Sequence, residues 1–227
     1  IITKKFWIYL MNFELKKRIF TSLILLTLLV FMYYYNYILI VSLIIISLIS
    51  WIEFYGLISK IFISNKILKF LFKSVSLVYL LFLVLGIFYV LSNLPELKIF
   101  FVYTILVSVA SDIGGLTFGK IFKGRKLTKI SPNKTISGTV GSFIFSFLLI
   151  PFFDILLVNH DLLSLLAITI LISLTTQLGD LFMSFVKRKA KVKNTSDLLP
   201  GHGGILDRID GIIFSIPIGF LLLNYFL

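Results

Sequence analysis

The chain has 227 residues, of which 59% are hydrophobic and 14% are charged, and its mean hydropathy is +1.06. A soluble domain has about 45–50% apolar and about 25% charged residues, so this composition excludes a soluble globular domain and also a disordered chain. The absence of cysteine excludes disulfides and thiolate metal sites, and two histidines are too few for a His-rich zinc site. We therefore predict an integral membrane protein.

Apolar segments long enough to cross a bilayer recur along the whole chain. A spanning helix needs about 20 mainly apolar residues, and seven stretches qualify or nearly do: 19–35, 37–58, 75–93, 98–118, 137–158, 162–185 and 205–226. The first two form one run that is too long for a single span, so we divide it at Tyr35-Asn36-Tyr37. These segments predict an all-α fold, a polytopic membrane helix bundle of about seven transmembrane helices, in which residues 19–227 form the membrane domain.

Basic residues divide the loops between these spans into two groups. Of the 22 Lys and Arg residues, all except Lys98 lie before the first span or in the loops after spans two, four and six. Basic residues in short loops stay in the cytoplasm, so we expect residues 1–18 to be a cytoplasmic N-terminal segment and the C-terminus to lie outside. Cytoplasmic retention and attraction to anionic lipid account for the net charge of +12, so we expect no nucleic-acid partner.

The loop between the last two spans brings three aspartates close to apolar sequence. Asp180 lies near the end of the sixth span, and Asp207 and Asp210 are three residues apart, which puts them on one face if the chain is helical there. A hairpin between the two helices would bring all three carboxylates together. Because such carboxylates repel one another and are costly to desolvate, a divalent cation that prefers oxygen ligands, such as Mg²⁺, would stabilise them.

The same loop is rich in groups that bind phosphate. Lys187 follows Asp180 by seven residues, two helical turns along the same face. Arg188 and Arg208 carry planar guanidinium groups suited to bidentate phosphate contacts. The Pro-Gly-His-Gly-Gly turn at 200–204 has little side-chain bulk, so backbone N–H groups can approach an anion just before a helix begins. Carboxylates for a metal, basic side chains and open amides together are typical of a phosphoryl or nucleotidyl transfer site.

Two alternatives to a transfer site remain open from the residues alone. In the first, Asp207, Arg208 and Asp210 form a buried ion-pair cluster that joins helices, and the glycines only allow a tight turn. In the second, the protein is a small transporter or channel whose intramembrane acids line an ion path. A path through the bilayer predicts acids spread along its length, whereas these acids cluster with Lys, Arg and Gly near one face.

The loop between spans four and five has a basic, hydroxyl-bearing turn before the next span. At a helix N-terminus, Ser131, Lys134 and Thr135 can hold a phosphate, and spacing alone leaves this reading even with a structural one. The Lys-Thr pair superficially matches the end of a P-loop, but the required glycine spacing is absent, which excludes that motif. For Gly138 and Gly141 we favour close helix packing over a role in binding.

These motifs resemble the signature of the phosphatidate cytidylyltransferase, or CDP-diacylglycerol synthase, family. The family pattern runs Ser, any residue, an apolar residue, Lys-Arg, four residues of any kind and Lys-Asp, and after a few residues Pro, any residue, His-Gly-Gly, apolar, any residue, Asp-Arg, apolar, Asp. This sequence meets it at Ser184, Val186, Lys187, Arg188, Lys193, Ser196, Leu199, His202, Gly203, Gly204, Ile205, Asp207, Arg208, Ile209 and Asp210. The Gly179-Asp180-Leu181 segment and the 130–135 turn also resemble the family. Asn194 stands where the family has Asp, so we assign it no metal or proton role.

The resemblance implies an enzyme that joins CTP to phosphatidate and gives CDP-diacylglycerol and pyrophosphate, with its catalytic half at about residues 98–227. It implies a metal-binding role for Asp180, Asp207 and Asp210, and a catalytic role also for Lys187 and Arg208. The implied substrate-binding residues are Ser131, Lys134, Thr135, Arg188, His202, Gly203 and Gly204.

Cofactor, partners and location follow from the same resemblance. Mg²⁺ is the implied cofactor, with a second, monovalent cation such as K⁺ left open. The implied partners are CTP, phosphatidate and the lipid bilayer, and a homodimer is suggested by the family alone. The implied location is the cell (inner) membrane, with several spans and an active site that faces the cytoplasm. A CTP-dependent kinase of lipid alcohols shares the nucleotide and the membrane, but the long match from Ser184 to Asp210 favours the cytidylyltransferase.

Overall fold

A computed structural model describes most of the chain. The described residues are 20–21, 23–94, 98–128, 131–132, 134–156, 161–200 and 203–226. The predicted cytoplasmic segment 1–18 and the candidate residue His202 lie outside them. Every regular element of the described residues is a helix, and their β-type pairing is limited to two isolated bridges, Lys126 with Thr135 and Leu199 with Gly203. The predicted all-α class is confirmed.

The described helices belong to two compact units. The first unit comprises Ile1–Phe88 and Ala190–Arg208, and the second comprises Tyr89–Lys189 and Ile209–Leu227. Each unit therefore combines segments that are far apart in the sequence, because the loop after the sixth predicted span returns to the N-terminal helices.

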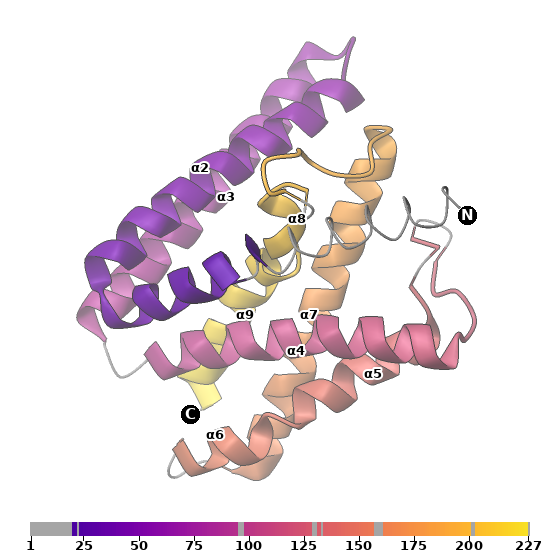
Figure 1. Ribbon diagram of the computed structural model, residues 1–227. Helices are drawn as coiled ribbons and strands as arrows, with labels where there is room; N and C mark the ends of the chain where they lie inside the picture. Colours follow the sequence, from indigo (N-terminus) through magenta and orange to yellow (C-terminus); the bar gives the residue numbers. More distant parts are fainter. Residues whose placement is uncertain are drawn as a thin grey trace, which may run out of the picture. The chain divides into compact units, whose positions relative to one another are not determined.

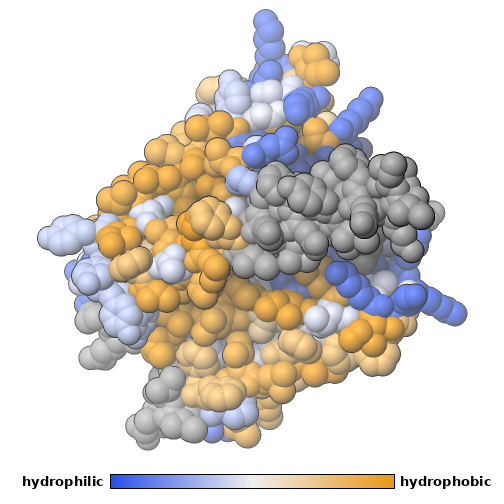
Figure 2. Space-filling view, viewed as in Figure 1, coloured by the Kyte–Doolittle hydropathy of each residue, from blue (hydrophilic) through white to orange (hydrophobic). Residues whose placement is uncertain are grey.

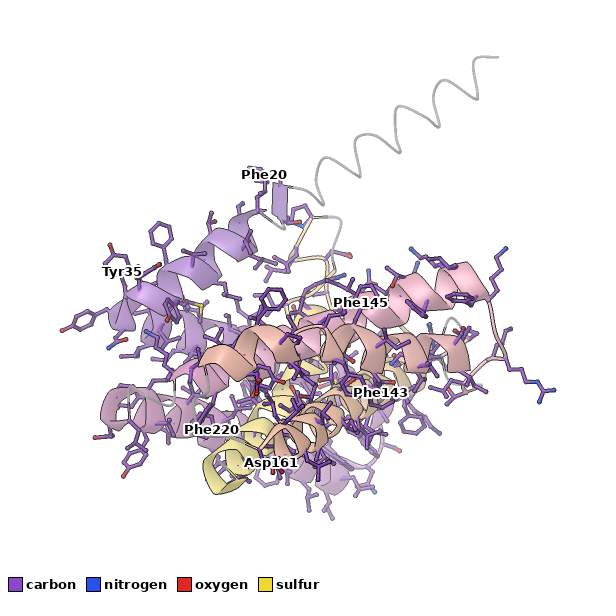
Figure 3. All side chains as sticks on the ribbon, turned by 90° about the horizontal axis from the view of Figure 1, so that it is seen from below. Phe20, Tyr35, Phe143, Phe145, Asp161 and Phe220 are labelled. Atoms are coloured by element: carbon purple, nitrogen blue, oxygen red, sulfur yellow. The ribbon has the colours of Figure 1, made fainter. Side chains whose placement is uncertain are left out.

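The first unit contains the helix Leu23–Tyr34, then α2 (Asn36–Ile61) and most of α3 (Lys66–Asn93). Tyr35, labelled in Figure 3, lies between the first two helices in an extended conformation, with φ −119° and ψ 107°. A residue with β-type dihedrals cannot continue an α-helix. The predicted division of the long apolar run at Tyr35 is therefore confirmed.

Helices α2 and α3 form a hairpin within this unit, and Figure 1 shows them side by side. The Trp51 Nε1–H donates to the Lys73 carbonyl oxygen at 3.2 Å, and the Lys73 Nζ lies 3.0 Å from the centre of the Tyr55 ring. Near the turn, the rings of Phe62 and Phe72 stack with their centres 5.2 Å apart. The ring contacts and the buried lysine stem hold the two helices together.

The second unit is a bundle of five helices among the described residues: α4 (Lys98–Phe122), α5 (Ile136–Phe147), α6 (Ile150–Leu156), α7 (Leu162–Lys189) and α9 (Ile212–Phe226). Helix α4 packs against α5, α7 and α9, and α7 also packs against α5, α6 and α9. Figure 1 shows α5 alongside α4, with α7 crossing both. Helix α7 carries candidate residues at its C-terminal end, so its packing decides where they lie.

Small glycines let α4 and α5 approach closely. A Cβ on Gly138 would lie 2.8 Å from the carbonyl oxygen of Gly115, and one on Gly141 would lie 2.7 Å from that of Gly114. Neither distance leaves room for a side chain. The packing role predicted for Gly138 and Gly141 is confirmed, and small residues at such contacts are typical of membrane helices.

The interior of the second unit has an apolar layer and a layer of hydroxyl groups. The apolar cluster consists of Phe100, Tyr103, Val107, Ile150, Phe153, Leu165, Ile168 and Ile172. Beside it, hydroxyls on α4, α7 and α9 pair across helices: Tyr103 with Thr169 at 2.5 Å, Ser108 with Ser215 at 2.7 Å and Ser111 with Ser173 at 2.9 Å. Interhelical hydrogen bonds between buried hydroxyls are a usual means of association for helices in lipid.

Length and surface both mark these helices as membrane-spanning. Within the described part of the chain, five helical segments are long and apolar enough to cross a bilayer, namely α2, α3, α4, Ile136–Asp154 and α7, whereas Leu23–Tyr34 is shorter. Large hydrophobic side chains remain exposed along them, and Figure 2 shows such residues over much of the visible face. The protein is a multi-pass membrane protein. The count of seven spans and the orientation of the N-terminus stay predictions.

The last predicted span, 205–226, is not one continuous helix. It consists of a single turn, α8 (Leu206–Ile209), followed by a turn at Asp210 and Gly211 before α9 begins. The Gly211 N–H donates to Asp210 Oδ1 at 3.0 Å, and a Cβ on Gly211 would lie 2.9 Å from the carbonyl oxygen of Thr176. A side chain that accepts from nearby backbone competes with the helix. Asp207 and Asp210 therefore do not share one helix face, which corrects the expectation from their spacing.

Candidate functional site

One carboxylate–ammonium pair joins the loop before α5 to helix α7 in the second unit. The Lys134 Nζ lies 2.5 Å from Asp180 Oδ2, and the Ser184 hydroxyl donates to Asp180 Oδ1 at 3.4 Å. Lys134 is placed by the start of α5, where the Thr135 hydroxyl accepts from the Gly138 N–H at 3.1 Å as an N-cap. The N-cap fixes the backbone conformation of Thr135, the residue next to Lys134. The Lys134 side chain reaches α7 at Asp180.

A second pair joins α7 to the turn before α9. The Lys187 Nζ lies 3.6 Å from Asp210 Oδ2, and these side chains are only 12% and 10% exposed. Lys187 is in the last turn of α7, where a cation is favoured by the helix dipole. The spacing of Lys187 from Asp180 predicted that both lie on one face of this helix. Asp180 pairs with Lys134 and Lys187 pairs with Asp210, all within the second unit, which agrees with that prediction.

Helix α7 contacts the turn before α9, and the start of α9, at Gly179. A Cβ on Gly179 would lie 2.6 Å from Phe214 Cδ2 and 3.0 Å from the carbonyl oxygen of Asp210. Asp180 follows Gly179 directly on α7, and Asp210 lies in the turn before α9. The second unit thus presents two carboxylates and two ammonium groups at one end of α7.

The first unit holds the third predicted aspartate in a network of its own. Asp207 Oδ2 accepts three hydrogen bonds, from the Thr195 N–H at 2.8 Å, the Thr195 hydroxyl at 3.0 Å and the Gly204 N–H at 3.1 Å. The turn before it is closed by paired backbone hydrogen bonds between Leu199 and Gly203. Gly203 has φ +82°, in the left-handed region that favours glycine.

Sequence analysis missed one functional candidate in the first unit, Glu53 on α2. Its carboxylate accepts from the Thr195 and Ser196 hydroxyls at 2.8 Å and 2.6 Å, and from the Ile205 and Leu206 N–H groups at 3.1 Å and 2.9 Å. The residue is buried, with 7% of its surface exposed. An acid inside an apolar span is itself a signal of function, and that signal was available in the segment 37–58.

The remaining described candidates lie in the turn before α5 and at exposed positions of α7 and α8. Ser131 lies in the turn before α5, where its N–H donates to the Thr128 hydroxyl oxygen at 3.2 Å. Arg188 and Arg208 are exposed on α7 and α8. Asn194 lies against Gly203, since a Cβ on that glycine would be 3.3 Å from its Cγ. The phosphate contacts expected of Ser131, Arg188 and Arg208 stay predictions.

The first alternative, a buried ion pair between helices with glycines that allow a tight turn, is partly realised. Asp210 is in a buried ion pair, and Gly203 does serve a tight turn. A buried pair of this kind is weak evidence for a purely stabilising role, because desolvation offsets much of its attraction. The pairing is equally compatible with lysines that meet phosphate when substrate is bound.

The donor chemistry of the second unit fits Mg²⁺. Asp180 and Asp210 supply carboxylate oxygens, which Mg²⁺ prefers, and it commonly takes its other ligands from water and substrate phosphate. Among the described residues, no group of three or more His, Cys, Asp or Glu side chains lies close enough to hold a metal ion. Asp207 belongs to the other unit, so the convergence of all three aspartates stays a prediction.

Helices, glycine contacts and charged pairs together describe a multi-pass membrane protein with a polar, charged site at the end of an apolar bundle. The model of the cytidylyltransferase family matches residues 3–226, nearly the whole chain. The chain belongs to the cytidylyltransferase family.

Curated relatives carry one common name. The chain is 36% identical over 165 residues to the phosphatidate cytidylyltransferase of Staphylococcus saprophyticus, covering 71% of this chain and 63% of that protein. It is 42% identical over 122 residues to the phosphatidate cytidylyltransferase of Staphylococcus aureus strain COL, covering 52% and 46%. The enzyme of that name from Helicobacter pylori strain J99 is 36% identical over 126 residues, covering 56% and 47%. The chain thus spans less than two thirds of the length of these relatives.

Proposed function

We propose that this chain is a phosphatidate cytidylyltransferase. In this reaction a phosphate oxygen of phosphatidate forms a bond to the α-phosphorus of CTP, the bond from that phosphorus to the β-phosphate oxygen breaks, and pyrophosphate leaves. Membership of the cytidylyltransferase family and the shared name of the relatives support the proposal. The products are CDP-diacylglycerol and pyrophosphate.

The observation that carries this function is the presence of two lysine–aspartate pairs on α7. One pair joins α7 to the loop before α5, and the other joins it to the turn before α9. Lys134 pairs with Asp180, and Lys187 pairs with Asp210. Two polyanionic substrates must approach each other here, so each needs cations close by. Lysines already held in place supply such cations without a further cost of ordering.

The protein's own residues have distinct roles in this mechanism. Lys134 and Lys187 contact the phosphates of CTP and phosphatidate and hold the two in line, which lowers the entropic part of the barrier. The hydroxyls and amides at the start of α5 bind a further phosphate oxygen. No covalent intermediate on the protein is required, because the lipid phosphate is itself the nucleophile.

Aspartates complete the site. Asp180 and Asp210 would hold Mg²⁺, which when bound would neutralise charge on the transferring and leaving phosphates, and a metal-binding role for Asp207 stays a prediction of the family resemblance. Each carboxylate also orients its lysine, so a change in one carboxylate alters the position of a cation. A second, monovalent cation and a homodimer stay predictions of the family resemblance.

We place the site on the cytoplasmic side of the cell membrane. The basic loops of the sequence support this orientation, since all basic residues except Lys98 fall on one side of a seven-span arrangement. CTP is a polar cytoplasmic nucleotide, whereas the acyl chains of phosphatidate remain in the bilayer. A site at that surface gives both substrates access.

A single assay tests the function. The full chain, purified in detergent, is incubated with labelled CTP, phosphatidate and Mg²⁺, and the label that becomes soluble in chloroform is measured. We expect a nucleotide lipid that forms only with phosphatidate and disappears with EDTA. Diacylglycerol in place of phosphatidate is the control, because it lacks the attacking phosphate. No labelled lipid from protein that remains folded would refute the proposal.

A further inference from the structure

Glu53 is the only acid on α2, and it lies among apolar residues of a membrane helix. An ionised carboxylate in such surroundings is costly unless donors surround it. Its two oxygens accept four hydrogen bonds, all from residues between Thr195 and Leu206. The four donors offset the cost of burying the charge. An apolar side chain of the same shape would accept none of these hydrogen bonds.

The four donors belong to a segment with little regular structure. The described residues between 190 and 205 contain no helix, and they are held by the Leu199–Gly203 bridge and by side-chain contacts. Two of the donors to Glu53 are the N–H groups of Ile205 and Leu206, at the point where α8 begins. The first N–H groups of a helix have no partner within it. Glu53 therefore caps this turn from a distant helix.

Glu53 and Asp207 both accept from the Thr195 hydroxyl and share its single proton. The Thr195 Oγ1 lies 2.8 Å from Glu53 Oε2 and 3.0 Å from Asp207 Oδ2. The Glu53 carboxylate also occupies the space beside Gly204, since a Cβ there would lie 2.6 Å from Glu53 Oε1 and would contact Oε2 and the Thr195 hydroxyl. The second glycine of the Gly203-Gly204 pair is thus explained by the carboxylate that lies against it.

We propose that Glu53 is a positioning residue that holds the Thr195–Asp207 segment in its working conformation. The segment carries Asp207 and the Gly203-Gly204 turn, which sequence analysis assigned to metal and substrate binding. Glu53 does not need to touch substrate: it acts through the backbone amides and hydroxyls it binds. Its effect on turnover rests on the cytidylyltransferase activity proposed above, whereas its hold on the segment does not.

The test compares Glu53→Gln with the unaltered full chain in detergent. Glutamine has the same shape but only one accepting oxygen, so packing is retained while two of the four donors lose their acceptor. Asp154→Asn is the matched control, because it makes the same chemical change at an exposed position on α6. Hydrogen–deuterium exchange is measured over Thr195–Leu206 and over α7, together with the kcat and KM for CTP incorporation.

We expect exchange in Thr195–Leu206 to rise at least about tenfold in Glu53→Gln while exchange in α7 is unchanged, since a lost buried hydrogen bond is worth about that factor. We expect kcat to fall by about 10-fold to 100-fold, because a displaced site residue costs rate even far from the chemistry. Asp154→Asn should leave both unchanged. A residue that only fills space would leave Glu53→Gln equal to the unaltered chain.

A second variant covers the case in which Glu53→Gln does not fold. Ser196→Ala keeps the carboxylate and removes one donor, so exchange in the same segment should rise by a smaller factor. Unchanged exchange in Thr195–Leu206 in the folded variants would overturn the proposal, and so would faster exchange with normal kcat. The unaltered chain could make no nucleotide lipid while Glu53→Gln still shows faster exchange in Thr195–Leu206. That result would refute the cytidylyltransferase activity but support the positioning of the segment by Glu53.

Discussion

The Lys134 ammonium lies 2.5 Å from the Asp180 carboxylate, although 46 positions in the sequence (180 − 134) separate them. Helix α5 begins one residue after the Thr135 cap, and α7 carries Asp180 near its C-terminal end. The pair therefore links the two loops in which sequence analysis placed the phosphate-binding residues, and both belong to the second unit.

Replacing this lysine should reduce turnover. We expect Lys134→Gln to lower kcat/KM for CTP incorporation by about 100-fold, since loss of one preorganised cationic donor to a reacting phosphate costs about that factor. The matched control is Lys126→Gln, an exposed lysine in the same loop whose bridge to Thr135 uses backbone atoms only. Equal loss in both variants would assign the effect to loop charge in general and would contradict a specific role for Lys134.

The buried pair of Lys187 and Asp210 allows structural and chemical roles to be separated. Removing one partner of a buried pair destabilises by about 3–5 kcal/mol, so we expect Asp210→Asn to lower the Tm in detergent as well as the activity. The double variant Asp210→Asn with Lys187→Met removes the unpaired charge and should regain much of the Tm. If the pair serves only stability, the double variant will also regain turnover, which would contradict a catalytic role for both Lys187 and Asp210.

Asp161→Asn is the control for that experiment. Asp161 is an exposed carboxylate just before α7 and is labelled in Figure 3. Because its charge is solvated, its loss should change neither the Tm nor the turnover by a measurable amount. A fall in Tm equal to that of Asp210→Asn would show that any lost acid destabilises the chain.

Much of the helical architecture could be predicted because lipid imposes a simple requirement on length and polarity. Each spanning helix needs about 20 apolar residues, so the long run over 19–58 had to be divided, and the Tyr-Asn-Tyr sequence at 35–37 interrupts it. The interruption at Asp210-Gly211 was missed, although an Asp-Gly pair is a usual turn signal. Apolar residues on both sides of it favoured one uninterrupted helix.

The site could be predicted only in part, and the limit was distance along the sequence. That Lys187 and Asp180 lie on one face of α7 follows from helical periodicity, a local rule. Glu53 could not be assigned a partner in this way, since its donors lie 142 to 153 residues further along the chain. Contacts at such separation depend on tertiary packing, which no local pattern encodes.

The predicted orientation in the membrane has a direct test, because the chain contains no cysteine. Asp161→Cys introduces a thiol in a loop predicted to lie outside, and Ser64→Cys introduces one in the basic loop after α2, predicted to lie in the cytoplasm. A membrane-impermeant maleimide applied to intact cells should label Asp161→Cys alone. Labelling of Ser64→Cys should require permeabilised cells. The reverse pattern would place the basic loops, and the site with them, outside.

The contact of α7 with α9 at Gly179 determines how close Asp180 and Asp210 come, so a small side chain there should impair both stability and turnover. In Gly179→Ala the new Cβ meets Phe214 Cδ2 at 2.6 Å and the Asp210 backbone at 3.0 Å, and backbone cannot move aside as a flexible side chain can. Overpacking of this kind costs about 1–3 kcal/mol.

Gly56→Ala on α2 is the matched control: nothing lies within 4 Å of its Cβ, and alanine is favoured over glycine in a helix by about 0.5–1 kcal/mol. We therefore expect a lower Tm and at least about a tenfold lower kcat for Gly179→Ala, against an equal or higher Tm and normal kcat for Gly56→Ala. Normal turnover in Gly179→Ala would mean that the approach of the two aspartates does not limit the reaction.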